Sequence, residues 1–173
     1  SAHVFGHSSG AILALAAAQH GLPISKLAVY EPPYVIEGTR TRAGDDLADR
    51  LKASTREDAV TLFLTEAVGV PAPVVDGMRG GPAWGWLTGL AHTLSYDVTI
   101  CGPGARLPIE RLATIDTPTL AIGGSASAGW MTAAAQAVAD TVPGGRYVEL
   151  AGHDHDVLNQ PEALRAILFE YFA

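Results

Sequence analysis

The sequence Gly6-His7-Ser8-Ser9-Gly10 contains a serine placed for nucleophilic chemistry. It follows the apolar run at residues 3–5, which predicts a strand, and it opens a run of small and aliphatic residues that predicts a helix. Such a tight turn holds Ser8 in strained backbone, and we expect only small residues on either side of it. The helix N-terminus favours an oxyanion, for which the Ser9 backbone N–H is a donor. Ser8 could instead be a helix N-cap, but the glycines and the preceding strand favour a nucleophile.

The segment Gly152-His153-Asp154-His155-Asp156 supplies two imidazoles and two carboxylates that could assist such a serine. A serine nucleophile needs a base to take its proton, and histidine is the residue used most often. His153 and His155 compete for that role. The same cluster could ligate zinc, but no third histidine or acidic motif lies at a supporting spacing, so a metal site is disfavoured.

Strands and helices alternate around these residues. Apolar runs at residues 3–5, 26–30, 119–122 and 146–150 predict buried strands, and residues 10–20, 108–112, 130–142 and 161–172 predict helices. A strand, a helix and a strand in this order form a right-handed crossover in a parallel sheet. The histidine segment lies in the loop that follows the last strand.

Between residues 39 and 104 the strand signals vanish and the apolar spacing becomes helical. We expect helices at residues 43–53, 54–68, 74–78 and 82–94, the second of them started by a capping box at Ser54-Thr55-Arg56-Glu57. The sequence therefore predicts a core formed by residues 1–38 and 105–173, with residues 39–104 inserted as a helical lid or cap. The aromatic side chains expected to be exposed on this insertion are Phe63, Trp84, Trp86 and Tyr96.

Composition narrows the class of protein and its partners. The chain has 173 residues, of which 48% are hydrophobic and 17% charged, as expected of a globular domain. A net charge of −7 gives no electrostatic case for binding nucleic acid or an anionic membrane. The single cysteine, Cys101, cannot form an internal disulfide and fits a reducing compartment. We therefore expect a cytoplasmic protein that spans no membrane.

With these elements the chain resembles the α/β-hydrolases that carry a helical lid. The matching residues are the turn at residues 6–10, which corresponds to the family's nucleophile elbow, Tyr30-Glu31-Pro32-Pro33, Asp116-Thr117-Pro118-Thr119-Leu120, and the histidine loop before an apolar last helix. The resemblance covers all 173 residues and corresponds to the C-terminal two thirds of a typical member. It implies an α/β fold in which helices flank a parallel sheet, and Ser8 in the nucleophile elbow.

The family's first four strands have no counterpart in this sequence, nor has the loop that supplies the second oxyanion donor. Because the elbow strand is central in the family's sheet, one apolar edge of it would be left without a neighbour. We therefore expect a companion N-terminal segment of the same protein to supply the missing strands and loop. A homodimer that pairs through this edge is a less favoured alternative.

The resemblance also bears on the base and the acid. The family's histidine often follows a glycine and two further residues after the last strand, which favours His155 over His153 as the base. The family's usual aspartate after the strand at residues 120–123 is absent, since residues 124–129 contain no carboxylate. Glu31 is the predicted acid instead, at the strand end where haloalkane dehalogenases carry a glutamate. It could alternatively pair with an arginine or cap the lid.

Haloalkane dehalogenases use an aspartate nucleophile where this chain has Ser8, so acyl transfer is favoured over dehalogenation. The resemblance thus implies a cofactor-free serine hydrolase that acts on an ester, thioester or similar small apolar carbonyl substrate through an acyl-enzyme. Two alternatives stay open, a non-catalytic ligand-binding or receptor-like homologue and an acyltransferase. The side chains that could line an acyl pocket are Phe63, Met78, Trp84, Trp86 and Leu87, although packing between lid helices is their commoner role.

Overall fold

A computed structural model describes residues 1–173, which divide into two units. The sheet unit comprises Ser1–Arg40 and Arg106–Ala173, and the helical unit comprises Thr41–Ala105. Each unit has its own buried cluster of apolar side chains.

The sheet unit is built on four parallel strands. They are β1 (Ala2–His7), β2 (Ile24–Tyr30), β3 (Thr119–Gly124) and β4 (Arg146–Leu150), in the spatial order β1-β2-β3-β4. The predicted parallel α/β arrangement is therefore confirmed. Since the strands are parallel, their carboxyl ends share one edge of the sheet, where functional groups of such sheets gather. Within this sheet β1 pairs only with β2 and forms one lateral edge.

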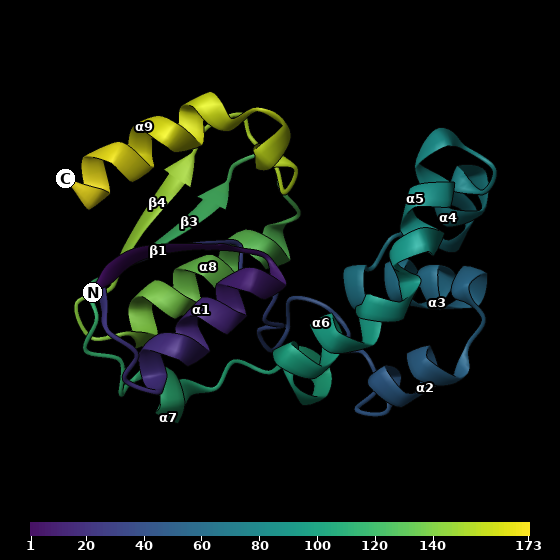
Figure 1. Cartoon of the computed structure of the whole chain (residues 1–173), viewed down its shortest axis with the longest axis horizontal. Helices are drawn as coiled ribbons and strands as arrows, with labels where there is room; N and C mark the ends of the chain where they lie inside the picture. The colour runs from purple at the N-terminus through teal and green to yellow at the C-terminus, as the bar shows by residue number, and fades with distance from the viewer. The chain divides into compact units, whose positions relative to one another are not determined.

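Helices cover both faces of the sheet (Figure 1). α1 (Ser9–Gln19) and α8 (Gly129–Thr141) lie on one face, and α9 (Pro161–Phe172) lies on the other. Alternate residues of a strand point to opposite faces, so Tyr30, Leu120 and Ile122 pack together under α9. The short helices α7 (Ile109–Leu112) and η4 (Val157–Asn159) complete this unit.

The helical unit consists of short helices around a core that includes Leu47, Val60, Val75 and Trp84. Its elements are α2 (Leu47–Ala53), α3 (Arg56–Leu62), the π-helix η1 (Phe63–Val68), α4 (Ala72–Met78), α5 (Pro82–Leu90), the 3₁₀ turn η2 (Ala91–Thr93), α6 (Leu94–Cys101) and the 3₁₀ turn η3 (Pro103–Ala105).

Three expectations for the helical unit were wrong in detail. The N-cap of α3 is Thr55, not Ser54: the Thr55 hydroxyl accepts the Asp58 N–H at 3.2 Å. The Ser54 hydroxyl instead donates to the Arg50 carbonyl in the last turn of α2. Helix α6 was missed because the prediction ended at residue 94, although the next glycine that breaks the helix is Gly102, with φ of 75°.

The third error concerns Trp84, which was expected to be exposed. It is buried in the core of the helical unit, with only 5% of its surface exposed. Its indole N–H donates to Glu57 Oε2 at 3.1 Å.

No helix of the chain is both long enough and apolar enough to cross a membrane.

Candidate active site

The turn between β1 and α1 holds Ser8 in a strained conformation. Its φ is 55° and its ψ is −127°, in a region that residues other than glycine rarely adopt. The Ser8 N–H donates to the Tyr30 carbonyl at 2.9 Å, and the Ser8 carbonyl accepts the Ala11 N–H at 2.9 Å. These bonds to β2 and α1 hold the turn, and the predicted strain is confirmed.

Gly6 and Gly10 differ in why they suit this turn. A Cβ on Gly6 would collide with the Gly10 carbonyl oxygen and would lie 2.7 Å from Ala11 Cα. A Cβ on Gly10 would meet no atom within 4 Å. The expectation that small residues are needed on both sides therefore holds for Gly6 and is wrong for Gly10.

Ser8, His155 and Glu31 form one hydrogen-bonded chain at the carboxyl ends of the strands. His155 Nε2 lies 3.0 Å from Ser8 Oγ, and His155 Nδ1 lies 2.7 Å from Glu31 Oε2. A carboxylate can only accept, so Nδ1 carries the proton and Nε2 is left to accept from the serine hydroxyl. The structure thus brings together the three residues that the sequence predicted as nucleophile, base and acid.

Glu31 directly follows β2 and is completely buried. Burial by itself would raise the pKa of Glu31, but hydrogen bonds from His155 and the Gly124 N–H, with the nearby Ser127 hydroxyl, outweigh it and lower the pKa below its usual value. The Gly124 N–H lies 2.8 Å from Oε1. The Ser127 oxygen is buried and makes no hydrogen bond. Glu31 is therefore charged at neutral pH.

Gly124 explains why no acidic side chain stands at the end of β3. A Cβ there would collide with the His153 carbonyl oxygen and would lie 2.5 Å from the Tyr30 hydroxyl. The position therefore accepts only glycine, whose backbone N–H supports Glu31 instead.

The predicted oxyanion donor, Ser9, is the first residue of α1. The N–H groups of a first helical turn point out of the helix end, where the helix dipole favours negative charge. Ser9 N–H thus lies directly beside the nucleophile, as the sequence pattern requires.

His153 does not join the hydrogen-bonded chain, since both ring nitrogens of His155 occupy the contacts to Ser8 and Glu31. No group of three or more histidine, cysteine, aspartate or glutamate side chains in residues 1–173 is arranged to hold a metal ion.

Two residues of the site had no role in the sequence prediction. His7 Nε2 donates to the His155 carbonyl at 2.8 Å, and its ring centroid lies 4.7 Å from that of His155. Tyr30 Oη donates to the Asp154 carbonyl at 2.7 Å. The only sequence signal for them is position, since they precede Ser8 and Glu31 directly.

The proposed acyl-pocket residues all lie in the helical unit, where they differ in exposure. Trp84 packs in the core of that unit, and Phe63, Met78 and Leu87 pack against the same core while half-buried. Trp86 is 67% exposed. Trp86 is thus the most exposed side chain of this set.

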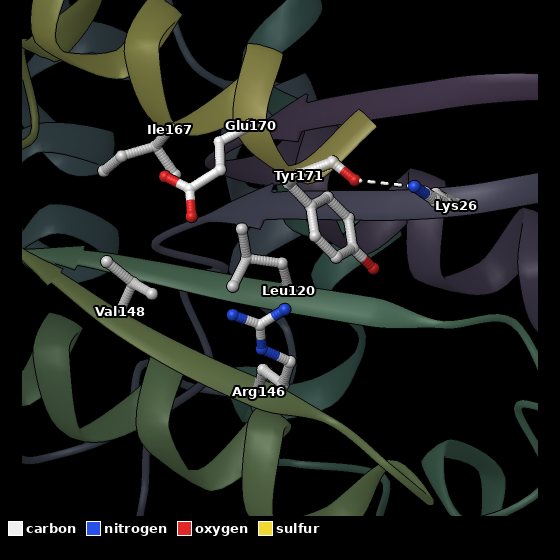
Figure 2. A pocket seen from close by; sticks show the side chains of 7 residues that line it. All are labelled: Lys26, Leu120, Arg146, Val148, Ile167, Glu170 and Tyr171. Carbon is white, nitrogen blue, oxygen red and sulfur yellow. Dashed lines mark hydrogen bonds between the residues drawn. The ribbon is translucent and has the colours of Figure 1, made fainter. Parts of the chain in front are cut away.

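A cavity of about 350 Å³ in the sheet unit lies away from the hydrogen-bonded chain. Figure 2 shows it between α9 and the sheet, with Lys26 Nζ donating to the Tyr171 carbonyl at 2.9 Å. Lys26 and Arg146 come from the amino-terminal parts of β2 and β4, whereas Ser8 and Glu31 follow the carboxyl ends of β1 and β2. This cavity is therefore separate from the candidate active site.

Comparison with known proteins places the chain in a family. The model of the alpha/beta hydrolase family matches residues 1–167. No curated protein sequence matches the chain significantly. Among solved structures, an alpha/beta hydrolase from Sphaerobacter thermophilus DSM 20745 is 44% identical with a TM-score of 0.87, over 99% of this chain and 67% of that one.

More distant structures share the fold. A hydrolase from Pseudomonas aeruginosa PA01 is 18% identical with a TM-score of 0.66, over 99% of this chain and 64% of that one. An enol-lactonase from Burkholderia xenovorans LB400 is 17% identical with a TM-score of 0.65, over 98% of this chain and 65% of that one. The chain thus spans about two thirds of the length of the solved structures it matches. Given the match over residues 1–167 and the relative that is 44% identical, the chain belongs to the alpha/beta hydrolase family.

Proposed function

We propose that this protein is a serine hydrolase that cleaves an ester, a thioester or a similar small apolar carbonyl substrate through an acyl-enzyme. The observation that carries the proposal is the unbroken chain from Ser8 Oγ through His155 to Glu31, with separations of 3.0 and 2.7 Å. Hydrogen-bond contact between nucleophile and base, with the base oriented by a third group, is the arrangement that activates a serine.

In the proposed reaction, His155 Nε2 takes the Ser8 hydroxyl proton as Oγ attacks the carbonyl carbon. The Ser9 N–H stabilises the oxyanion of the tetrahedral intermediate. Collapse of this intermediate expels the alcohol or thiol, which receives the proton from His155, and leaves the acyl group on Ser8. Water then attacks the acyl carbon while His155 takes its proton. The bond from the acyl carbon to Ser8 Oγ breaks, Oγ receives the proton from His155, and the acid is released. Glu31 stays ionised throughout and stabilises the imidazolium form of His155.

An apolar acyl group is proposed because the helical unit exposes large apolar side chains, among them Trp86, which is 67% exposed. Phe63, Met78 and Trp86 remain the proposed lining, whereas Trp84 is buried in the core of the helical unit; Trp86 is the first to test because it is the most exposed. Trp86→Ala should raise KM for a longer acyl chain more than for an acetyl ester, since a lost apolar contact weakens binding in proportion to the buried area. Equal effects on both esters would remove Trp86 from the proposed pocket.

We also propose that a companion N-terminal segment of the same protein pairs with β1. An edge strand presents unpaired N–H and C=O groups that favour pairing with a further strand. A second oxyanion donor from another loop would complete the site. Size exclusion with a denaturing mass spectrum tests this: a second polypeptide or additional sequence supports the companion, a doubled mass indicates a homodimer, and a folded monomer of this chain alone rejects both.

A fluorophosphonate probe tests the catalytic proposal, because it forms a covalent adduct only with an activated serine. The protein should gain one adduct, mapped by peptide mass spectrometry to Ser8, and Ser8→Ala should gain none. Hydrolysis of p-nitrophenyl butyrate should vanish in the same variant. If the folded protein takes no adduct with its companion segment bound, the protein is a non-catalytic ligand-binding member of its family. Transfer of the acyl group to an added amine or alcohol in preference to water would indicate an acyltransferase.

A further inference from the structure

The loop that carries His155 is exposed over much of its length. Ala151, Gly152, Asp154 and Asp156 are exposed, and His155 is half-buried. An exposed loop buries little apolar surface, so packing contributes little to holding it in one conformation. Polar contacts must therefore hold the imidazole between Ser8 and Glu31.

Such contacts are made at three successive carbonyl oxygens of the loop. The His153 carbonyl accepts the Ala126 N–H at 2.9 Å. The Asp154 carbonyl accepts the Tyr30 hydroxyl at 2.7 Å, and the His155 carbonyl accepts His7 Nε2–H at 2.8 Å. The donors come from the segment after β3, from β2 and from β1. The loop is therefore tied to three parts of the sheet unit that are far apart in sequence.

The two side-chain donors are also tied to one another. His7 and Tyr30 are partners in the register of β1 and β2, and their rings stack with centroids 5.7 Å apart. Each directly precedes a residue of the hydrogen-bonded chain, His7 before Ser8 and Tyr30 before Glu31. A shift of the loop would therefore have to break bonds to the same two strand ends that carry the nucleophile and the acid.

Both side chains keep the proton they donate at neutral pH. Burial lowers the pKa of His7, more than its hydrogen bond to the His155 carbonyl raises it. His7 is therefore neutral, and since a carbonyl only accepts, its one N–H is at Nε2. Burial, with the nearby charges of Glu31 and Asp154, raises the pKa of Tyr30, so its hydroxyl stays protonated. The neutral state of His7 also spares the imidazolium of His155 a like charge at a ring separation of 4.7 Å.

We propose that His7 and Tyr30 are positioning residues, which hold the catalytic histidine by donating to successive carbonyls of its loop. This inference rests on the proposed serine hydrolase function. A displacement of about 1 Å of a catalytic group can cost about a hundredfold in rate. Loss of either donor should thus lower kcat while KM changes little, because neither side chain is part of the proposed substrate pocket.

The test compares variants that keep a ring with one that keeps the donor. Tyr30→Phe and His7→Phe remove the donating atom and retain an aromatic ring. His7→Gln retains an N–H at a similar distance from the backbone. With p-nitrophenyl butyrate, the two phenylalanine variants should lose about 10- to 100-fold in kcat with KM within about twofold. His7→Gln should recover most of the loss, which a purely packing role of the ring would not allow.

His20→Phe is the matched control. His20 also bonds a backbone carbonyl through its ring, at 2.7 Å from the Ala16 oxygen, but at the far end of α1. Its kcat should equal that of the unaltered protein. A kcat within about twofold of the unaltered value in both Tyr30→Phe and His7→Phe would overturn the inference.

Hydrogen exchange of the peptide spanning residues 151–157 provides a readout that does not need turnover. Amide exchange in this segment should be faster in Tyr30→Phe and His7→Phe than in the unaltered protein, and unchanged in His20→Phe. Unchanged exchange in these two variants would show that the hydrogen bonds from His7 and Tyr30 do not hold the loop, even if the protein proved inactive. If the protein takes no fluorophosphonate but exchange is still faster in these variants, the proposed function is rejected while the positioning role of His7 and Tyr30 is supported. Circular dichroism verifies that each variant is folded, and Tyr30→Phe carries the test alone if His7→Phe unfolds.

Discussion

Replacing Glu31 by glutamine is the most informative single change, because it keeps the shape of a buried side chain and removes its charge. The carboxylate accepts from two donors, His155 Nδ1–H at 2.7 Å and the Gly124 N–H at 2.8 Å. An amide has one oxygen and one NH₂ group, so it can satisfy only one of these donors. If its NH₂ group faces His155, the proton moves to Nε2 and the ring can no longer accept from Ser8. If the NH₂ group faces Gly124, two donors oppose each other in a buried site.

The loss of charge sets the size of the effect. A unit charge about 4 Å from the imidazolium contributes about 4 kcal/mol at an effective dielectric constant of about 20. At about 1.4 kcal/mol for each factor of ten, this is about a thousandfold in rate. We therefore expect Glu31→Gln to reduce kcat/KM by about 10²- to 10⁴-fold. The opposed donors should cost about 1–3 kcal/mol in the free energy of unfolding.

The assay is the hydrolysis of p-nitrophenyl butyrate together with the rate of fluorophosphonate labelling of Ser8. Glu149→Gln is the control, since it removes a carboxylate from an exposed position of β4. Circular dichroism and urea denaturation separate loss of activity from loss of fold. If Glu31→Gln is folded and keeps its kcat/KM within about threefold, Glu31 is not the acid and the reasoning from its two hydrogen bonds fails.

Three further predictions follow from the geometry. His155→Ala should abolish labelling of Ser8 and His153→Ala should leave it within about threefold of the unaltered rate; the reverse pattern would reassign the base. Gly6→Ala should destabilise the protein by about 1–3 kcal/mol, because its Cβ would collide with the Gly10 carbonyl oxygen. Gly10→Ala should be neutral or should stabilise the protein by up to about 1 kcal/mol, because its Cβ would meet open space in a helix. Chemical denaturation measures both changes. Since the folded protein lowers the pKa of Glu31 from 4.5, the stability this group contributes should be complete above that pH and be lost as the pH falls below it; urea denaturation across the acid range should show this loss, and Glu31→Gln should lack it.

The order of strands and helices in the sheet unit was predictable because the signals were local. The elbow glycines, the apolar strand runs and the amphipathic last helix each depend on residues close in sequence, and β1, β2, β3, β4 and α9 lie where these signals indicated. The helical unit was less predictable, since Ser54 and Thr55 are both N-cap residue types. The structure decides between them, because the Thr55 hydroxyl accepts the Asp58 N–H while the Ser54 hydroxyl donates to the Arg50 carbonyl. Trp84 was misjudged for a similar reason: an indole in an amphipathic pattern becomes buried only when neighbouring helices close over it.

Residue types and spacing indicated a serine in a strand–turn–helix elbow, and the resemblance to the family implied a histidine after the last strand and a glutamate at a strand end as its partners. Folding in three dimensions was required to join them, because Ser8 and Glu31 lie 147 and 124 residues from His155 in sequence. The roles of His7 and Tyr30 depend on the same long-range geometry. Their hydrogen bonds end on backbone carbonyls, which every residue carries, so no pattern of side chains in the sequence could reveal them. A parallel sheet makes such contacts possible, since it brings the carboxyl ends of distant strands to one edge.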